Sequence, residues 1–225
     1  MLALVTGQSC DKSPTDTSTT APATRPHAGL TVASLVPAAT DLLVGMGCAD
    51  RLVAVSNWDP RRPETDGLPR VGDYRTIDWE KISELHPDVM IVQFRADKLP
   101  GIGMTQRAQE LGIRLVNVEN NRLDDLYRTM EQLGAAIGEP DAARTASDRV
   151  RSQLDVVKKR VAGKPPVRTL ICRSGTGLDV VGGGNYLDEI LQIAGGQNVI
   201  PGGENSYPTI DRELLISLDP DVVLH

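Results

Sequence analysis

The sequence predicts an α/β protein built as two lobes that are joined by one long helix. Short apolar runs alternate with amphipathic stretches, which is the pattern of helices packed on parallel sheets. A motif of 18 residues occurs twice, at 74–91 and at 207–224, with nine identical positions and no gap. Between the two copies lies one long segment with helical periodicity. We therefore expect one copy of the motif in each lobe.

The first lobe is predicted to begin after a polar N-terminal segment. Its strands are expected at 30–35, 51–56, 88–93 and 113–118, where apolar residues run together. Its helices are expected at 38–47, within the first motif copy, at 104–112 and at 123–138. The run at 88–93 is continuously apolar in its centre, which is typical of a strand buried on both faces of a sheet.

The segment at 141–162 is expected to be a single linking helix. Its apolar residues follow one another at steps of four and three: Ala142, Ala146, Val150, Leu154, Val157 and Val161. At about 1.5 Å per residue such a helix is on the order of 30 Å long. After it, strands are predicted at 167–172 and 178–182, a helix at 186–196, and then the second motif copy.

The expected domain organisation follows from this order. Residues 1–28 form a signal remnant or lipoprotein tether, 29–139 the N-terminal lobe, 140–164 the linking helix and 165–225 the C-terminal lobe. The first motif copy is followed by a loop, a helix, a strand and another helix, whereas only His225 follows the second. The C-terminal lobe is therefore expected to be incomplete.

The repeated motif has a local structural explanation. Asp78 and Asp211 are placed to accept hydrogen bonds from the first backbone N–H groups of a helix. An apolar residue precedes each cap and another follows inside the helix, at the spacing of a hydrophobic staple. Leu-x-Pro-Asp then ends each helix, because proline cannot continue the helical hydrogen bonds. This explanation leaves out two glutamates in the first helical turns, Glu80 and Glu213.

Two interpretations of Glu80 and Glu213 remain open at this point. Each carboxylate complements the partial positive charge of a helix N-terminus, an effect of about 0.3–1 kcal/mol. Alternatively, the pair forms a docking surface, one glutamate per lobe, for a partner that carries two arginines.

Composition excludes some classes of function. A hydrophobic content of 40% is ample for a packed core. The net charge of -6 leaves no basic stripe for a phosphate backbone, so nucleic-acid binding is not expected. No apolar run after the first few residues approaches the roughly 20 residues that a membrane-spanning helix needs.

The N-terminus carries a candidate lipid attachment site. A short apolar run ends at Cys10 and is followed by a Ser/Thr/Pro-rich tract, which is typical of an extended tether. The run resembles the end of a bacterial lipoprotein signal, with Cys10 as the lipidated residue. The alternative is an ordinary cysteine in a disordered tail.

Several motifs in order resemble one family. They are "TVASLVPAATDLLVGMG", "RLVAVSNWDP", "LPRVGDYRTIDWEKISELHPDVMIV", "LGIRLVNVE" and "YLDEILQIAGGQNVIPGG". The sequence from about residue 30 to 225 resembles the periplasmic binding proteins that deliver cobalamin and ferric siderophores to ABC importers. The resemblance implies a class III binding-protein fold, with two Rossmann-like lobes on parallel sheets and a rigid helix between them. It also implies a monomer in the periplasm or on the outer face of the cytoplasmic membrane, without enzymatic activity.

The resemblance also implies roles for particular residues. One exposed glutamate per lobe engages arginines of the permease dimer in this family, and Glu80 and Glu213 match those positions. The ligand lies between the lobes, so loops after the strands are expected to line it. We take the ligand-binding residues to be Pro37, Ala38, Trp58, Tyr74, Phe94, Arg95 and Tyr207. Aromatic side chains offer rigid apolar faces to a flat ligand; for Trp58 and Phe94 the alternative is burial beneath their own loops.

The ligand expected from this resemblance is cobalamin or a related corrinoid. A ferric siderophore or haem is the alternative within the family, because Arg75 and Arg95 suit an anionic chelate. Direct metal coordination is not expected, since His27, His86 and His225 are scattered along the chain. An enzyme acting on a phosphate compound is the alternative from another class, based on the strand, glycine turn and helix around "VVGGGNYLDEI". A truncated remnant without function is the third alternative.

Overall fold

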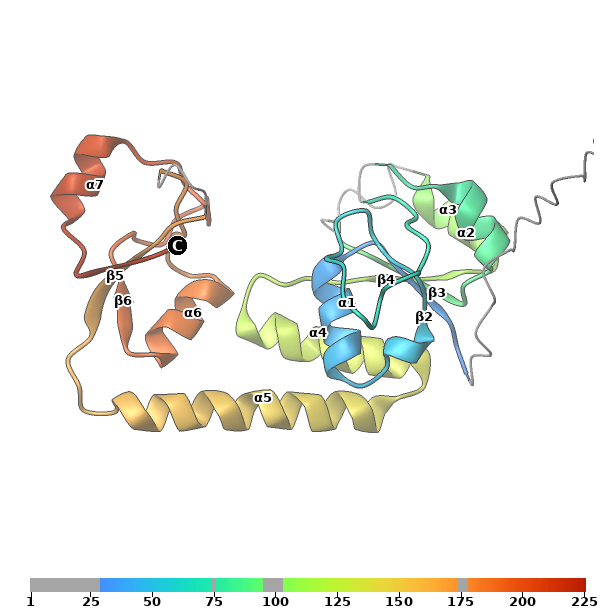
Figure 1. Cartoon of the computed structure of the whole chain (residues 1–225), viewed down its shortest axis with the longest axis horizontal. Helices are drawn as coiled ribbons and strands as arrows, with labels where there is room; N and C mark the ends of the chain where they lie inside the picture. Colours follow the sequence, from blue (N-terminus) through green and yellow to red (C-terminus); the bar gives the residue numbers. More distant parts are fainter. Residues whose placement is uncertain (1–28, 74–75, 95–102, 174–177) are drawn as a thin grey trace, which may run out of the picture.

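The computed structural model describes residues 29–73, 76–94, 103–173 and 178–225. It confirms the predicted α/β architecture, with one parallel sheet in each of two lobes (Figure 1). The first lobe contains β1 (Val32–Ser34), α1 (Pro37–Gly45), the 3-10 turn η1 (Ala49–Arg51), β2 (Leu52–Ala54), α2 (Trp79–Leu85), β3 (Val89–Val92), α3 (Met104–Glu110), β4 (Arg114–Asn117) and α4 (Leu123–Ile137). After α5 (Pro140–Val161), the second lobe contains β5 (Val167–Ile171), α6 (Tyr186–Ile193), β6 (Gly196–Asn198), α7 (Arg212–Leu218) and β7 (Val222–Leu224).

The first sheet has the strand order β2-β1-β3-β4, and all its pairs are parallel. Alternate residues of its central strands enter two different apolar clusters. Val89 and Ile91 pack with α1 and α4, whereas Met90 and Val92 pack with α2 and α3. Since all four residues are buried, the expectation of a strand covered on both faces is correct for β3.

The second sheet is smaller and has the order β6-β5-β7. Its core is a cluster of four buried residues: Leu170, Val180, Ile200 and Ile210. The strand predicted at 178–182 is absent. Asp179 and Val180 instead form single bridges to two different neighbours, Thr209 and Cys172, so no continuous ladder develops.

Strand β6 was not expected from the sequence, because its residues are Gly, Gln and Asn. Gly196 makes it possible. A Cβ atom there would lie 2.2 Å from the Leu191 side chain, so only glycine allows β6 to pass this close to α6.

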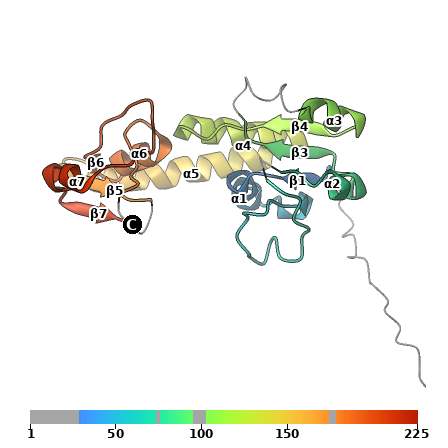
Figure 2. The same cartoon turned by 90° about the horizontal axis from the view of Figure 1, so that it is seen from above.

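Helix α5 begins and ends one residue before the range expected from periodicity. Its first half packs on α4, where a Cβ on Gly134 would lie 2.6 Å from the Ala143 Cβ. Figure 2 shows the second half of α5 continuing beyond α4 to α6. Val156 and Val157 in that half are exposed.

The domain boundaries 29–139, 140–164 and 165–225 remain a proposal. Within the described residues, no helix is long and apolar enough to cross a membrane.

Both copies of the motif form the predicted caps. The Asp78 side chain accepts a hydrogen bond from the Lys81 backbone N–H, at 3.1 Å, and Asp211 accepts one from Leu214, at 2.7 Å. Ile77 packs in the same apolar cluster as Ile82, as a hydrophobic staple requires. The local prediction from the repeated sequence is therefore confirmed.

Candidate functional site

The predicted ligand-binding residues that the structure describes lie in loops or at the start of a helix. Pro37 is the first residue of α1, directly after β1, and Ala38 beside it is exposed. Trp58 follows β2 and Phe94 follows β3, while Tyr207 precedes α7. Tyr74, Arg95 and the proposed lipidation site Cys10 lie outside the described residues, as does Arg75.

Trp58 projects from a loop that is held firmly from beneath. The Arg70 guanidinium donates to three backbone carbonyls of this loop, including Ser56 at 2.7 Å and Asp59 at 2.9 Å. The buried Asp59 carboxylate accepts the Ser56 N–H at 2.9 Å, and burial raises the pKa of this carboxyl group. The Trp58 side chain is 70% exposed, and its indole N–H donates to Asp73 at 2.8 Å. Burial beneath its own loop is therefore excluded for Trp58.

Phe94 is partly buried and packs against the apolar cluster of α2 and α3. The Asn117 side chain fixes its backbone by two hydrogen bonds, accepting from the Phe94 N–H at 2.8 Å and donating to the Phe94 carbonyl at 2.9 Å. The structure thus shows the partial burial that was the alternative for this residue.

Tyr207 forms a cation–π contact with Arg173, and it also affects the titration of Tyr186; neither partner was predicted. The Arg173 guanidinium lies over its ring, 4.2 Å from the centroid. Burial raises the pKa of Tyr186, and the proximity of Tyr207 adds to this shift. Tyr186 was not singled out because its position in the sequence is simply the first residue of an amphipathic helix.

Direct contacts between the lobes were also missed by sequence reasoning. The Tyr186 N–H donates to the Asn121 carbonyl at 2.8 Å, and the Leu123 N–H donates to Glu189 Oε2 at 2.7 Å. Arg122 forms an ion pair with Glu189 and donates to the Gly184 carbonyl at 3.1 Å. The start of α4 and the start of α6 therefore meet above α5 (Figure 1). Residues 66 positions apart in the chain give no local pattern from which this meeting can be predicted.

Glu80 and Glu213 are both exposed in the first turns of α2 and α7. Figure 1 shows these helices at the two ends of the molecule, both on the opposite side from α5. Each lobe thus carries one exposed glutamate in a helix that lies on the side opposite to α5.

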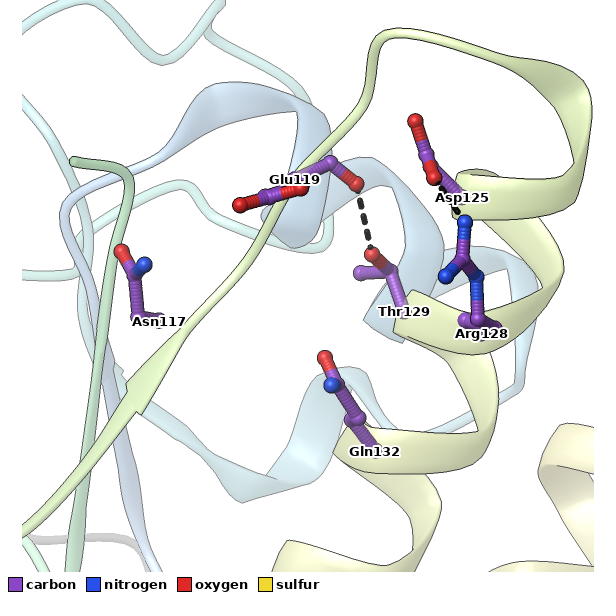
Figure 3. A pocket seen from close by; sticks show the side chains of 6 residues that line it. All are labelled: Asn117, Glu119, Asp125, Arg128, Thr129 and Gln132. Atoms are coloured by element: carbon purple, nitrogen blue, oxygen red, sulfur yellow. Dashed lines mark hydrogen bonds and ion pairs between the residues drawn. The ribbon is translucent and has the colours of Figure 1, made fainter. Parts of the chain in front are cut away.

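Two surface hollows lie beside α4, and neither is lined by Trp58, Phe94 or Tyr207. Figure 3 shows one of about 130 Å³ between the end of β4 and α4. Its lining is polar: Thr129 donates to the Glu119 carbonyl at 3.0 Å, and Arg128 pairs with Asp125. It is too small and too polar for a corrinoid. A larger hollow of about 660 Å³ lies where α5 ends beside α6 and the start of α4.

The family model that describes the periplasmic binding proteins matches residues 32–225. The chain belongs to this family. It is thus a substrate-binding protein of ABC importers. Such binding proteins deliver their ligand to the permease of the importer. The family consists of binding proteins, so the interpretation as an enzyme is abandoned.

This periplasmic binding protein is similar to several characterised relatives. It is 27% identical over 199 residues to the vitamin B12-binding protein of Vibrio cholerae, covering 88% of this chain and 71% of the relative. The crystal structure of the periplasmic vitamin B12 binding protein BtuF of Vibrio cholerae matches with a TM-score of 0.69 and 26% identity, covering 87% of this chain and 75% of that one. A periplasmic heme binding protein of Pseudomonas aeruginosa matches with a TM-score of 0.71 and 25% identity, over 87% and 71% of the two chains.

Proposed function

We propose that this binding protein captures cobalamin, or a related corrinoid, between its two lobes and delivers it to an ABC importer. The observation that carries this proposal is the exposed indole of Trp58, which donates to Asp73 and projects from a loop that Arg70 holds. A rigid aromatic face binds a flat macrocycle without a large loss of side-chain entropy. The similarity to vitamin B12-binding proteins supports the same choice of ligand.

In this proposal the ligand lies among residues from both lobes. Pro37, Ala38, Trp58, Tyr74, Phe94 and Arg95 contribute from the first lobe, and Tyr207 contributes from the second. Phe94 acts mainly through its backbone position, because its ring is packed against the core. Tyr207 offers the face of its ring opposite to Arg173.

Calorimetric titration of residues 29–225 with cyanocobalamin tests the proposal. We expect saturable binding that weakens by about 1–3 kcal/mol in Trp58→Ala. Ile216→Ala is a matched control, because Ile216 is an apolar side chain with a similar exposure of 72% that lies on α7. Equal affinities of the wild type and Trp58→Ala would remove Trp58 from the site.

We further propose that Glu80 and Glu213 bind arginines of the permease dimer. Replacement of both by Arg is expected to abolish transport in membrane vesicles and to leave calorimetric ligand binding unchanged. Glu84→Arg is the control, since Glu84 is also exposed on α2 but lies at the opposite end of that helix. Normal transport by the double variant would exclude the docking role.

Lipid attachment through Cys10 and a monomeric state complete this proposal. The Ser/Thr/Pro-rich tract after Cys10 would tether the lobes to the outer face of the cytoplasmic membrane. Mass spectrometry of the protein from membranes, with Cys10→Ser as a comparison, tests the attachment.

Haem or a ferric siderophore is the second candidate ligand. Arg173 over Tyr207 favours it, because a guanidinium binds the carboxylate or other anionic groups of such ligands. Titration with haem and with a panel of ferric siderophores distinguishes the candidates. Binding of one of these without cyanocobalamin binding would replace the first proposal.

A further inference from the structure

Two helix N-termini from different lobes face one another on the side of α5 that the lobes share (Figure 1). Helix α4 starts at Leu123 in the first lobe, and α6 starts at Tyr186 in the second. Glu189, in the first turn of α6, reaches across the boundary and accepts the Leu123 N–H at 2.7 Å. Its other carboxylate oxygen pairs with Arg122.

Glu189 provides a hydrogen-bond acceptor for the start of α4 that the N-cap residue of α4 does not provide. The first backbone N–H groups of a helix lack partners within the helix and carry partial positive charge. The residue at the N-cap of α4 is Arg122, whose side chain has no acceptor. Glu189 supplies an acceptor and a negative charge from the other lobe, and Arg122 supplies the cation for Glu189.

Both sides of the contact are held in place within their own lobes. In the first lobe, the buried Asp125 carboxylate accepts the N–H groups of Asn121 and Arg122 at 3.0 and 2.8 Å. In the second, the buried Asp188 carboxylate accepts the Gly184 N–H at 2.8 Å. The contact between the lobes therefore joins two ordered turns and not two flexible side chains alone.

We propose that Arg122 and Glu189 form a latch that sets the distance between the two lobes. Helix α5 joins the lobes along one side of the molecule only, so bending of this helix would separate the lobes on the other side (Figure 1). The latch adds a second connection away from α5. It is adjacent to Tyr186, whose backbone N–H donates to Asn121 across the same boundary. Because Tyr186 and Tyr207 belong to the same lobe, the latch would also position the second-lobe wall of the proposed ligand site.

Hydrogen exchange of the Leu123 amide, followed by NMR, tests the latch directly and without a ligand. In Glu189→Ala we expect the exchange of this amide to accelerate by at least about tenfold, because it loses its acceptor. Glu189→Gln retains an acceptor oxygen and is expected to show a smaller acceleration. Glu131→Ala is the control, since Glu131 is an exposed acid of α4 within one lobe. Unchanged exchange in Glu189→Ala would overturn the proposal.

Small-angle X-ray scattering tests the positioning role. Arg122→Ala and Glu189→Ala are each expected to broaden the distribution of interatomic distances, while circular dichroism and the melting temperature remain close to those of the Glu131→Ala control. Accelerated exchange at Leu123 with an unchanged scattering profile would show that Glu189 only caps α4, and would overturn the positioning role.

A ligand experiment extends this test and rests on the proposed function. With cyanocobalamin as the probe, Glu189→Ala is expected to weaken binding by roughly tenfold, because the open lobes must first be brought together. If the wild type does not bind cyanocobalamin, the proposed ligand fails, whereas the exchange and scattering results still decide the latch. Equal affinity of wild type and Glu189→Ala would show that the latch does not position the site.

Discussion

The two copies of the motif place the same sequence pattern in two different environments. In the first lobe, the strand of the motif is β3, and each of its residues is buried. In the second lobe, the corresponding strand is β7, and each of its residues is exposed. Both strands pair in parallel with the first strand of their lobe, β3 with β1 and β7 with β5. The backbone arrangement is therefore shared, and only the surroundings differ.

The difference shows that the apolar sequence of a strand does not by itself determine whether the strand is buried. Strand β3 has a further strand beside it and helices on both faces, whereas β7 has β5 on one side only among the described residues. Most of the free energy of burial depends on the area removed from water. Equivalent substitutions in the two copies should therefore have unequal effects. Three experiments test this expectation, and a fourth compares the caps of the two helices.

The largest effect is expected from a charge in the centre of each strand. Met90→Lys places an ammonium group where no part of the side chain is exposed, and we expect a loss of more than about 4 kcal/mol or complete unfolding of the first lobe. Val223→Lys, at the equivalent and 55% exposed position, should leave the second lobe folded. Trp58 and Trp79 both lie in the first lobe, so tryptophan fluorescence in urea measures its stability. Similar losses in the two variants would contradict the comparison.

Truncation in the helix of the motif should have the next largest effect. Ile82 in α2 is fully buried, so Ile82→Ala is expected to cost about 2–5 kcal/mol. Leu215 in α7 is only partly buried, so Leu215→Ala should cost less than about 2 kcal/mol. Urea denaturation monitored by circular dichroism, together with hydrogen exchange of the β5 amides, measures the two lobes separately. A larger cost for Leu215→Ala would refute the expected order.

An identical substitution at equivalent positions gives a finer comparison. Val89→Thr introduces a hydroxyl group without a partner at a buried position and is expected to cost about 1–3 kcal/mol. Val222→Thr, at a position that is 40% exposed, should change the stability by no more than about 0.5 kcal/mol. Both variants retain the β-branched shape. An equal loss of stability at the two positions would therefore mean that the loss comes from replacing valine in a strand and not from burial of the hydroxyl group.

The smallest effect concerns the caps of the two helices and depends on pH. The Lys81 ammonium group lies 2.9 Å from the Asp78 carboxylate, and its hydrogen bond holds the pKa of Asp78 below its usual value. The resulting stabilisation is present at pH values above the unfolded pKa of Asp and is lost as the pH falls through the lower folded pKa. The second copy has Leu214 at the position of Lys81, so it lacks this ion pair.

Lys81→Met should therefore raise the pKa of Asp78 towards its usual value, as measured by NMR titration of the carboxyl carbon. The difference in stability between wild type and Lys81→Met should be visible near neutral pH and disappear in acid. A pKa of Asp78 that does not respond to this substitution would assign the shift to the backbone N–H bonds of the cap.

Much of the fold was predictable because it depends on local patterns. The caps at Asp78 and Asp211 need only an aspartate three residues before a free N–H group, and the long helix α5 needs only a repeated apolar spacing. The segment at 178–182 was wrongly predicted as a strand, because apolar composition does not determine which neighbours a segment meets. Strand β6 was missed for the converse reason, since a polar segment becomes a strand only by lying beside β5.

The sequence by itself determined the α/β alternation, the repeated capped helix, the linking helix and the family to which this binding protein belongs. It also indicated Trp58 and the two exposed glutamates as candidate functional residues. Only the tertiary structure decided that Trp58 is exposed while Phe94 packs against the core, and that Arg173 lies on Tyr207. It alone showed the contact of Glu189 with Arg122 and the start of α4. The physical reason is that caps and periodicity act over a few residues, whereas burial and contacts between lobes depend on groups brought together from distant parts of the chain.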